Sequence, residues 1–251
     1  MDLSSKMYIE LFHLMFLRKF NDNIAPELYA IKGGCNLRFF FQSMRYSEDL
    51  GIDVQTIQKQ TLEKKVDKIL NSSSFLKLLQ GYGVTSFNKS SPKQTETTQR
   101  WKVQLHIDRL EMPVNTKIEF SRRHEEFQSE LSDVRRETCQ QYHLPPMRLS
   151  YYELHDAVKQ KILALAYRSL TQARDVFDLY HLLHVENHKK IELGRNDIEK
   201  AKESLLSVGF NDYQSQVVSF LEAKYQKALS DSKHWENIVD EILVYLEGLT
   251  K

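Results

Sequence analysis

Hydrophobic residues near the start of the chain recur with the period of an α-helix. Positions i, i+3, i+4, i+7 and i+8 of this segment are Tyr8, Leu11, Phe12, Met15 and Phe16. Residues at these spacings share one face of a helix. The pattern predicts a buried amphipathic helix over residues 1–20, and Pro26 is expected to open a short helical stretch that reaches Ala30.

The same period returns between residues 55 and 72 and over most of the C-terminal hundred residues. In the first of these segments the apolar positions alternate with lysines and acids, which is typical of a helix with a solvated outer face. Five further helices are expected in the C-terminal part, at residues 152–170, 173–184, 195–208, 212–227 and 233–249.

Strict alternation of apolar and polar residues marks two segments, 101–107 and 116–121, as strands of a sheet. The Ser/Lys-rich residues 88–93 are predicted to form a polar loop, and residues 125–141 a charged connection. The pattern therefore predicts an α+β protein: a sheet with flanking helices in residues 1–148, followed by a helical bundle in residues 149–251.

Composition and charge narrow the class of protein. The 251 residues are 41% hydrophobic, which is enough for a core without disulfides. The 35 basic and 34 acidic side chains leave a formal net charge of +1, so overall charge does not indicate a nucleic-acid-binding protein. The only cysteines, Cys35 and Cys139, predict a reducing compartment and argue against structural zinc. No apolar run approaches the roughly twenty residues that cross a bilayer, so we expect a soluble, cytoplasmic protein.

A glycine pair, Gly33-Gly34, precedes a short apolar segment that contains Arg38. Glycine permits positive φ and a close approach of a ligand to the backbone. Free N–H groups at the start of a helix favour phosphate, because they lack partners within the helix and lie at its positive end. The segment predicts a phosphate-binding turn, although an ordinary loop and core helix would show the same pattern.

The residues that follow, Arg45-Tyr46-Ser47-Glu48-Asp49-Leu50-Gly51-Ile52-Asp53, carry two carboxylates at alternate positions. If the segment is extended, Asp49, Gly51 and Asp53 share one face of a strand. Taken alone, this arrangement is also compatible with acids on a solvated face.

Together these two stretches resemble the nucleotidyltransferase family of AbiEii/AbiGii-type toxins, a branch of the DNA polymerase β-like fold. The resemblance consists of the glycine pair, a short helix with an arginine, and the pattern R-[FY]-S-E-D-L-x-[FI]-D. It implies a nucleotidyltransferase-like mixed sheet with flanking helices and a nucleotide-binding turn that includes Gly33, Gly34 and Arg38. It also implies Mg²⁺ as a cofactor, because nucleotidyl transfer needs carboxylates that hold an ion on the triphosphate.

One position departs from the family's pattern. The family takes its first metal ligands from the D-x-D of S-E-D-[LI]-D; here Asp49 matches the first position, but Gly51 occupies the second. Asp53 lies on the same strand face, roughly 6.5 Å further along. The family often places a third acid in a neighbouring strand, where Glu119 is the candidate. The implied metal-binding and catalytic acids are thus Asp49, Asp53 and Glu119, although a half-exposed edge glutamate would explain Glu119 equally well.

A second block, residues 161–168 followed by 173–180, resembles the family's E-K-x-x-A-L-x-x-R…R-D-[LV]-[YF]-D-L, with Gln160 replacing the usual Glu. By this resemblance Lys161 contacts a nucleotide phosphate, and either Arg168 or Arg174 supplies a second cation.

In the same block, the resemblance implies that Asp175 or Asp178 orients these cations. Lys161 and Asp175 complete the implied catalytic set. The alternative is a salt-bridged helical hairpin in which Arg174, Asp175 and Asp178 cap and pair.

The resemblance implies a toxin-like enzyme that transfers NMP from an NTP to a tRNA end or to a protein, as part of a toxin–antitoxin or phage-defence module. A cognate antitoxin is a further implied partner. Because Gly51 replaces a metal ligand, a catalytically degenerate nucleotide- or RNA-binding protein is the alternative. A purely structural partner of an antitoxin is a third possibility.

Overall fold

The computed structural model describes residues 3–122, 127–186 and 191–249, so part of the predicted connection at 125–141 lies outside the described residues. The chain forms two compact units. We call residues 1–40 and 47–152 the sheet unit, and residues 41–46 and 153–251 the helical unit. The domain boundary expected at residues 148–149 concerns independent folding and stays a prediction.

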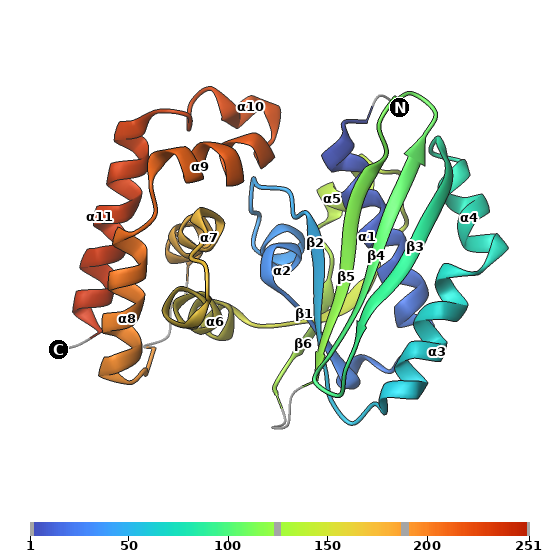
Figure 1. Ribbon diagram of the computed structural model, residues 1–251, viewed down its shortest axis with the longest axis horizontal. Helices are drawn as coiled ribbons and strands as arrows, with labels where there is room; N and C mark the ends of the chain where they lie inside the picture. Colours follow the sequence, from blue (N-terminus) through green and yellow to red (C-terminus); the bar gives the residue numbers. More distant parts are fainter. Residues whose placement is uncertain (1–2, 123–126, 187–190, 250–251) are drawn as a thin grey trace. The chain divides into compact units, whose positions relative to one another are not determined.

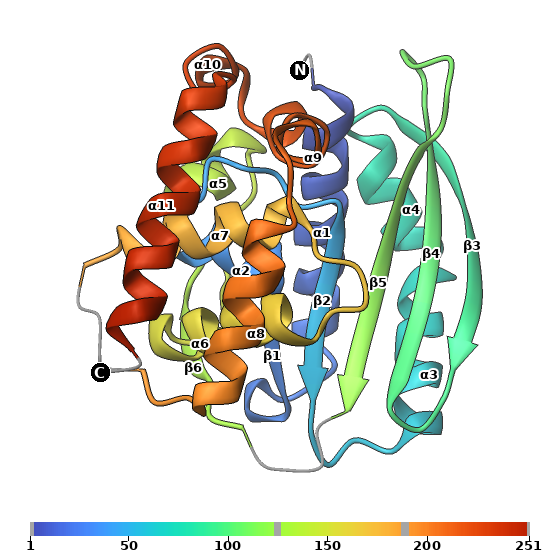
Figure 2. The ribbon, with the colours of Figure 1, turned by 60° about the vertical axis from the view of Figure 1, so that its left-hand side comes forward.

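A mixed seven-stranded sheet forms the centre of the sheet unit, in the order β3-β4-β5-β2-β1-β7-β6. Its strands are β1 (Tyr29–Lys32), β2 (Asp49–Val54), β3 (Val84–Gln94), β4 (Thr98–Ile107), β5 (Val114–Arg122), β6 (Glu130–Asp133) and β7 (Arg148–Tyr151). Figure 2 shows β2, β5, β4 and β3 side by side. Strand β2 pairs antiparallel with β1 and parallel with β5, so it occupies the middle of the sheet.

The core of the sheet unit lies between the sheet and its helices. These helices are α1 (Ser5–Asn21), η1 (Pro26–Leu28), α2 (Gly33–Phe40), α3 (Lys59–Leu70), α4 (Ser73–Gln80) and α5 (Arg136–Gln141). Fully buried Phe12 and Phe16 of α1 join Leu50 and Ile52 of β2 in one hydrophobic cluster. The periodicity of residues 8–16 therefore correctly predicted a buried helix. Figure 1 shows α3 and α4 beside β3.

The predicted loop at residues 88–93 is wrong, because these residues belong to the edge strand β3. The β3–β4 pairing is irregular between Ser90 and Lys93, on either side of Pro92. An edge strand tolerates proline and charged residues because one of its sides has no neighbouring strand. Serine and lysine at an edge therefore gave the composition of a loop.

Two other local predictions also need correction. The short helix after Pro26 ends at Leu28, and Ala30 lies in β1, where it pairs with Asp53. The region predicted as a polar connection contains β6 and α5. Strand β6 is almost entirely exposed at the other edge of the sheet, so it lacks the apolar alternation that reveals a half-buried strand.

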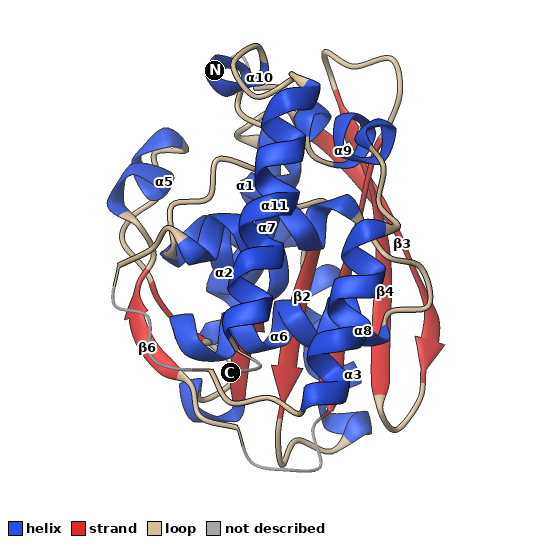
Figure 3. Cartoon of the chain, turned by 90° about the vertical axis from the view of Figure 1, so that its left-hand side faces the viewer, coloured by secondary structure: helices blue, strands red, loops and turns tan. Residues whose placement is uncertain are grey.

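The helical unit consists of α6 (Leu154–Tyr167), α7 (Ala173–Leu183), α8 (Arg195–Leu206), α9 (Phe210–Gln216), η2 (Val218–Phe220), α10 (Ala223–Gln226) and α11 (Ser232–Gly248). Figure 3 shows these segments as helices. Buried Ile162, Leu179 and Ile242 show that the apolar positions of these helices face inward. Among the described residues, no helix is both long and apolar enough to cross a membrane.

A single helix over residues 212–227 was predicted, but the chain breaks there into α9, η2 and α10. The break lies at Val217, whose ψ of −64° and φ of −119° depart from the helix. In the segment that follows, backbone groups pair with the segment 45–46. Phe220 O accepts from Tyr46 N at 2.9 Å, and Leu221 forms a bridge with Arg45. Contacts with residues distant in sequence thus replace the helical hydrogen bonds.

Candidate active site

Strand β2 places Asp49 at its first position and separates two environments. Leu50 and Ile52 point into the core, whereas Asp49 and Gly51 lie on the opposite face and are partly exposed. This alternation follows from the two-residue repeat of a strand. The same face of β5 presents Lys117, which is the register partner of Asp49.

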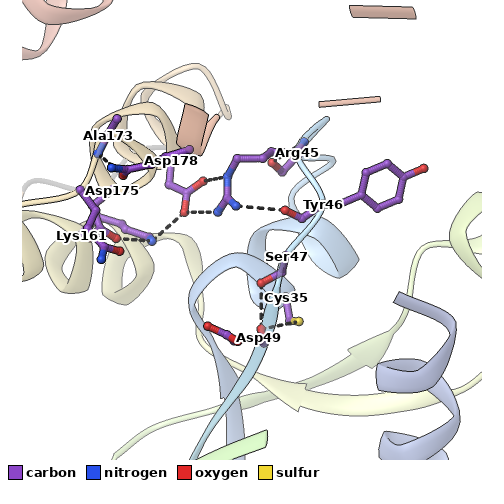
Figure 4. A network of polar contacts seen from close by, with 12 residues as sticks. Cys35, Arg45, Tyr46, Ser47, Asp49, Lys161, Ala173, Asp175 and Asp178 are labelled. Atoms are coloured by element: carbon purple, nitrogen blue, oxygen red, sulfur yellow. Dashed lines mark hydrogen bonds and ion pairs between the residues drawn. The ribbon is translucent and has the colours of Figure 1, made fainter. Parts of the chain in front are cut away.

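The backbone of Asp49 is held by two side chains. Its carbonyl accepts hydrogen bonds from Ser47 Oγ at 2.8 Å and from Cys35 Sγ at 3.4 Å; Figure 4 shows both. Ser47 is therefore a turn residue, and Cys35 at the first turn of α2 contacts the predicted metal-binding residue. Fixing the backbone limits the directions in which the Asp49 carboxylate can point.

A buried histidine extends this support. Thr116 Oγ1 donates to Glu48 O at 2.6 Å and lies 2.8 Å from Nε2 of His13, which is fully buried in α1. Since the threonine proton is used on the carbonyl, we assign the Nε2 proton to His13. Burial lowers the pKa of His13 to about 3, so the imidazole is neutral near pH 7.

Each of the three predicted metal-binding acids has its own cation. The ion pairs are Asp49–Lys117 at 2.8 Å, Asp53–Lys32 at 2.5 Å and Glu119–Arg100 at 2.5 Å. The side chains of Asp49 and Glu119 are 27% and 28% exposed, whereas that of Asp53 is fully buried and also accepts from Tyr152. Within the described ranges, no group of three or more His, Cys, Asp or Glu side chains is arranged to hold a metal ion.

These donors do not form a three-carboxylate metal site. Mg²⁺ is commonly bound by one or two carboxylates together with substrate phosphates rather than by a complete protein cage. Asp49 fits this limited role, because its side chain and that of its ion-pair partner Lys117 are both partly exposed. The metal-binding roles of Asp53 and Glu119 stay predictions.

The predicted phosphate-binding turn begins at Gly33, whose φ of +66° is in the left-handed region that glycine adopts readily. Gly34 follows in the first turn of α2. Arg38, predicted to bind nucleotide, is only 4% exposed and donates from Nε to both carboxylate oxygens of Glu10, at 2.9 and 3.1 Å. In this arrangement Arg38 joins α2 to α1.

In the helical unit, a buried network connects α6, α7 and the segment 41–46 (Figure 4). Asp178 accepts from Arg45 Nε at 3.0 Å and from Arg45 Nη2 at 2.8 Å. Lys161 Nζ donates to Asp178 at 2.7 Å and to Asp175 at 3.0 Å. All four side chains are less than a tenth exposed, so the predicted Lys161 and Asp175 do meet, but as partners of each other.

Asp178 is ionised in this network. Burial alone would raise the pKa of its carboxyl, but the positive charges of Arg45 and Lys161 outweigh burial and hold the pKa well below its usual value. The bidentate pair with Arg45 fixes the orientation of the carboxylate. Asp178 therefore positions the two cations.

Asp175 differs from Asp178 in having one oxygen without a hydrogen-bond donor among the described residues, although it is almost fully buried. Arg168 Nε lies 3.1 Å from this Oδ2, an ion-pair distance that lacks hydrogen-bond geometry. Arg168 is the most exposed side chain of the network, at 36%, and its Nη1 donates to Gln172. Arg174 is half-buried at the start of α7.

Arg45 was not predicted as a site residue. It lies within the R-Y-S-E-D motif, yet the motif alone does not reveal a partner 133 residues away in α7. The motif arginine was the one signal that the sequence carried. Two backbone hydrogen bonds, Tyr46 N to Phe220 O and Glu222 N to Met44 O, and the side-chain contact of His181 Nε2 with Phe41 O also hold the segment 41–46 in the helical unit.

Solved structures with a similar fold include two proteins from different bacteria. The JHP933 protein of Helicobacter pylori is 17% identical, with a TM-score of 0.53 over 99% of this chain and 97% of that chain. MenT4, a nucleotidyltransferase toxin of Mycobacterium tuberculosis, is 17% identical, with a TM-score of 0.56 over 96% of this chain and 92% of that chain. No curated protein matches the sequence.

A family model covers nearly the whole chain. Residues 16–247 match the family described as "Nucleotidyl transferase AbiEii toxin, Type IV TA system". The match includes both the Asp49 strand and the Lys161–Asp178 network, and it agrees with the mixed sheet and its flanking helices. The chain belongs to the AbiEii nucleotidyltransferase toxin family.

Proposed function

We propose that this protein transfers NMP from a Mg²⁺-bound NTP to an acceptor hydroxyl. The observation that carries the proposal is Asp49, a partly exposed carboxylate whose backbone is fixed by Ser47 and Cys35 on the family's motif strand. In the reaction, the acceptor oxygen bonds to the α-phosphorus, the bond to pyrophosphate breaks, and the hydroxyl proton passes to a base.

In the sheet unit, Asp49 would hold the Mg²⁺ that enters with the triphosphate. The ion pair between Asp49 and Lys117 would break when the ion binds. The ion supplies charge neutralisation on the phosphates. Members of this family generally use a divalent metal, and Mg²⁺ is our choice because its usual ligands are carboxylate and phosphate oxygens.

The helical unit has its own cationic group, Lys161 and Arg168, to which the family motif assigns phosphate binding. Asp175 would orient both cations, because it accepts from Lys161 Nζ at 3.0 Å and its Oδ2 lies 3.1 Å from Arg168 Nε. Asp178 and Arg45 would hold Lys161 in place through the contacts already described.

The first test is thermal unfolding of the wild-type protein and of Asp49→Asn against each of the four NTPs, with and without Mg²⁺. A ligand that binds only the folded state raises its stability by mass action. We expect a Mg²⁺-dependent shift with at least one NTP that is absent from Asp49→Asn. A shift of equal size in the variant would remove Asp49 from the site.

Transfer itself is measured with NTPs labelled at the α-phosphate, using RNA and protein fractions as acceptors. Label in tRNA or in protein would identify the acceptor, and label in neither would leave binding without transfer. A second assay compares nucleotides: Lys161→Ala should weaken triphosphate binding more than monophosphate binding. Equal losses would argue against a phosphate contact at Lys161.

Gly51 motivates a second candidate function. With no carboxylate at this position, the protein would bind nucleotide or RNA without transferring NMP. NTP-induced stabilisation with no labelled acceptor would favour this candidate. The absence of any nucleotide effect would instead favour a structural partner of an antitoxin.

The family's description as a toxin implies a cognate antitoxin as a partner, which is a proposal for this chain. Expression of the chain alone in bacteria, compared with expression of Asp49→Asn, tests toxicity. Growth arrest by the wild-type chain only is the expected result.

A further inference from the structure

The side chain of Lys32 occupies the space beside Gly51. These two residues are register partners in the antiparallel β1–β2 pair. A Cβ atom built on Gly51 would lie 3.1 Å from Lys32 Cγ and 3.5 Å from Lys32 Cε. Such a Cβ contact is tight, so a side chain at position 51 would require the Lys32 side chain to shift by a few tenths of an ångström. Glycine therefore makes room for Lys32.

The Lys32 side chain extends past Gly51, and its ammonium group is held by two acceptors. Nζ donates to Asp53 Oδ1 at 2.5 Å and to Ser121 Oγ at 2.8 Å. An ammonium group has three donors, and the third has no acceptor among the described residues. The Lys32 side chain is 19% exposed. Lys32 is thus a fixed cation with one free donor and access to solvent.

Lys32 is paired with a residue two positions from the candidate metal-binding acid, and its ammonium group lies at Asp53, two positions further along the strand. Gly51 is two residues from Asp49 on the same strand face, a separation of about 7 Å, and Lys32 is paired directly with Gly51. Phosphate oxygens of a nucleotide whose metal is held by Asp49 would therefore lie within reach of a lysine side chain.

The net charge that Lys32 brings is the same as that of a carboxylate with a bound divalent ion. A carboxylate at position 51 with a divalent ion would add −1 and +2, a net charge of +1, which is also the charge of one lysine. Lysine binds phosphate as a point charge without needing a metal.

We propose that Lys32 binds the triphosphate of the NTP and replaces, with its own positive charge, a metal ion that a carboxylate at position 51 would hold. This inference rests on the proposed function and specifies how that site takes its substrate. In this arrangement the loss of the motif acid at Gly51 accompanies the gain of a phosphate-binding lysine.

The competing explanation is that Lys32 only neutralises buried Asp53. The double variant Lys32→Met/Asp53→Asn separates the two, because it removes both charges together and leaves an amide oxygen at position 53 that can accept from Tyr152. Replacing both members of a buried pair with neutral residues of similar size is far less damaging than removing one.

The chain provides a matched control pair on another strand. Lys89 and Asp67 are also 2.5 Å apart, Lys89 is 22% exposed, and Asp67 accepts a second hydrogen bond from the aromatic donor Trp101 Nε1. Lys89 lies in β3 and its partner lies in α3. The variant Lys89→Met/Asp67→Asn thus removes an ion pair of the same length outside the proposed site, although its carboxylate is 39% exposed.

The experiment is calorimetric titration of the full chain with NTP, the matching NMP and inorganic tripolyphosphate, each with Mg²⁺. We expect Lys32→Met/Asp53→Asn to lose about tenfold or more in affinity for NTP and tripolyphosphate, as for loss of a charge-assisted hydrogen bond. Affinity for NMP should change much less, and the control pair should bind like wild type.

Wild-type affinity in a folded Lys32→Met/Asp53→Asn variant would overturn the inference and leave the proposed function intact. No NTP binding by the wild-type chain would overturn both. If this variant does not fold, Lys32→Gln/Asp53→Asn keeps a polar chain at position 32, and its triphosphate affinity decides in the same way.

Discussion

The charged residues of the two units differ in how they meet solvent. In the helical unit, Arg45, Lys161, Asp175 and Asp178 are almost fully buried. On the sheet face, the Asp49–Lys117 and Glu119–Arg100 pairs are about a quarter to a third exposed. A buried charge that loses its partner is costly, whereas an exposed pair contributes little. The buried Arg45–Asp178 pair therefore fixes structure, whereas the exposed pairs can exchange their partners for a ligand.

The largest effect is expected for Asp178→Ala, which tests the structural role of the buried network. It leaves Arg45 and Lys161 buried without one of their carboxylates, and we expect the free energy of unfolding to fall by about 3–5 kcal/mol. Urea unfolding followed by circular dichroism measures the change. Lys59→Ala, which removes an ion pair with the mostly exposed Glu96, is the control and should change stability by less than about 1 kcal/mol. Similar losses in both variants would refute the distinction.

A second prediction concerns the neutral histidine beneath the sheet face. The pKa of His13 is lowered from 6.5 to about 3 in the folded protein. Below pH 6.5 the unfolded chain therefore binds a proton at His13 that the folded chain does not. The free energy of unfolding therefore carries no penalty from His13 above this pH. The free energy of unfolding falls as the pH is lowered from 6.5 to about 3, with a slope that approaches about 1.4 kcal/mol per pH unit.

His13→Gln should flatten this part of the stability profile, as measured by urea unfolding at pH 7.5, 6.5, 5.5 and 4.5. Exposed His184 supplies the control His184→Gln. An unchanged slope in His13→Gln would show that His13 does not titrate on unfolding as its burial requires.

Gly51→Asp tests whether the sheet face merely lacks an acid. The new Cβ would press on Lys32, and the new carboxylate would compete with Asp53 for its ammonium group. We expect a loss of about 1–3 kcal/mol in stability, as for overpacking, and no gain in Mg²⁺-dependent NTP binding. Gly51→Ala separates the steric part. A large gain in binding would instead identify a degenerate metal site.

The smallest effect is expected for Glu119→Gln. Its ion pair with Arg100 is 28% exposed at Glu119, so stability should change by less than about 1 kcal/mol. NTP titration of this variant decides its predicted metal role. Retained Mg²⁺-dependent affinity would limit Glu119 to the pair with Arg100.

Local patterns in the sequence predicted the central elements well. The glycine pair and the apolar residues after it predicted α2, and alternation predicted β2, β4 and β5. The edge strand β3 was missed because a strand with one free side does not need apolar alternation. Helix 212–227 was wrong because its interruption depends on backbone contacts with the segment around Arg45.

The candidate site was predictable in its residue types but not in its pairings. Asp49 and Lys161 were predicted from the family's motifs, and their roles stay predictions. The Arg45–Asp178 pair joins residues 133 apart, and no local spacing encodes such a contact. The position of the Lys32 side chain beside Gly51 likewise depends on the register of two strands. A missing acid is visible in a sequence, but the side chain that fills its place is visible only in the fold.

The assignment of residues 41–46 to the helical unit has a consequence for how such a gene can recombine. The chain passes between the units at residues 40–41, 46–47 and 152–153. One genetic crossover at the last junction would transfer the helices without Arg45, and Asp178 would lose its bidentate partner. Exchange of the helical half between relatives therefore requires either matched inheritance of an arginine before the Ser47 turn or compensating changes in α7.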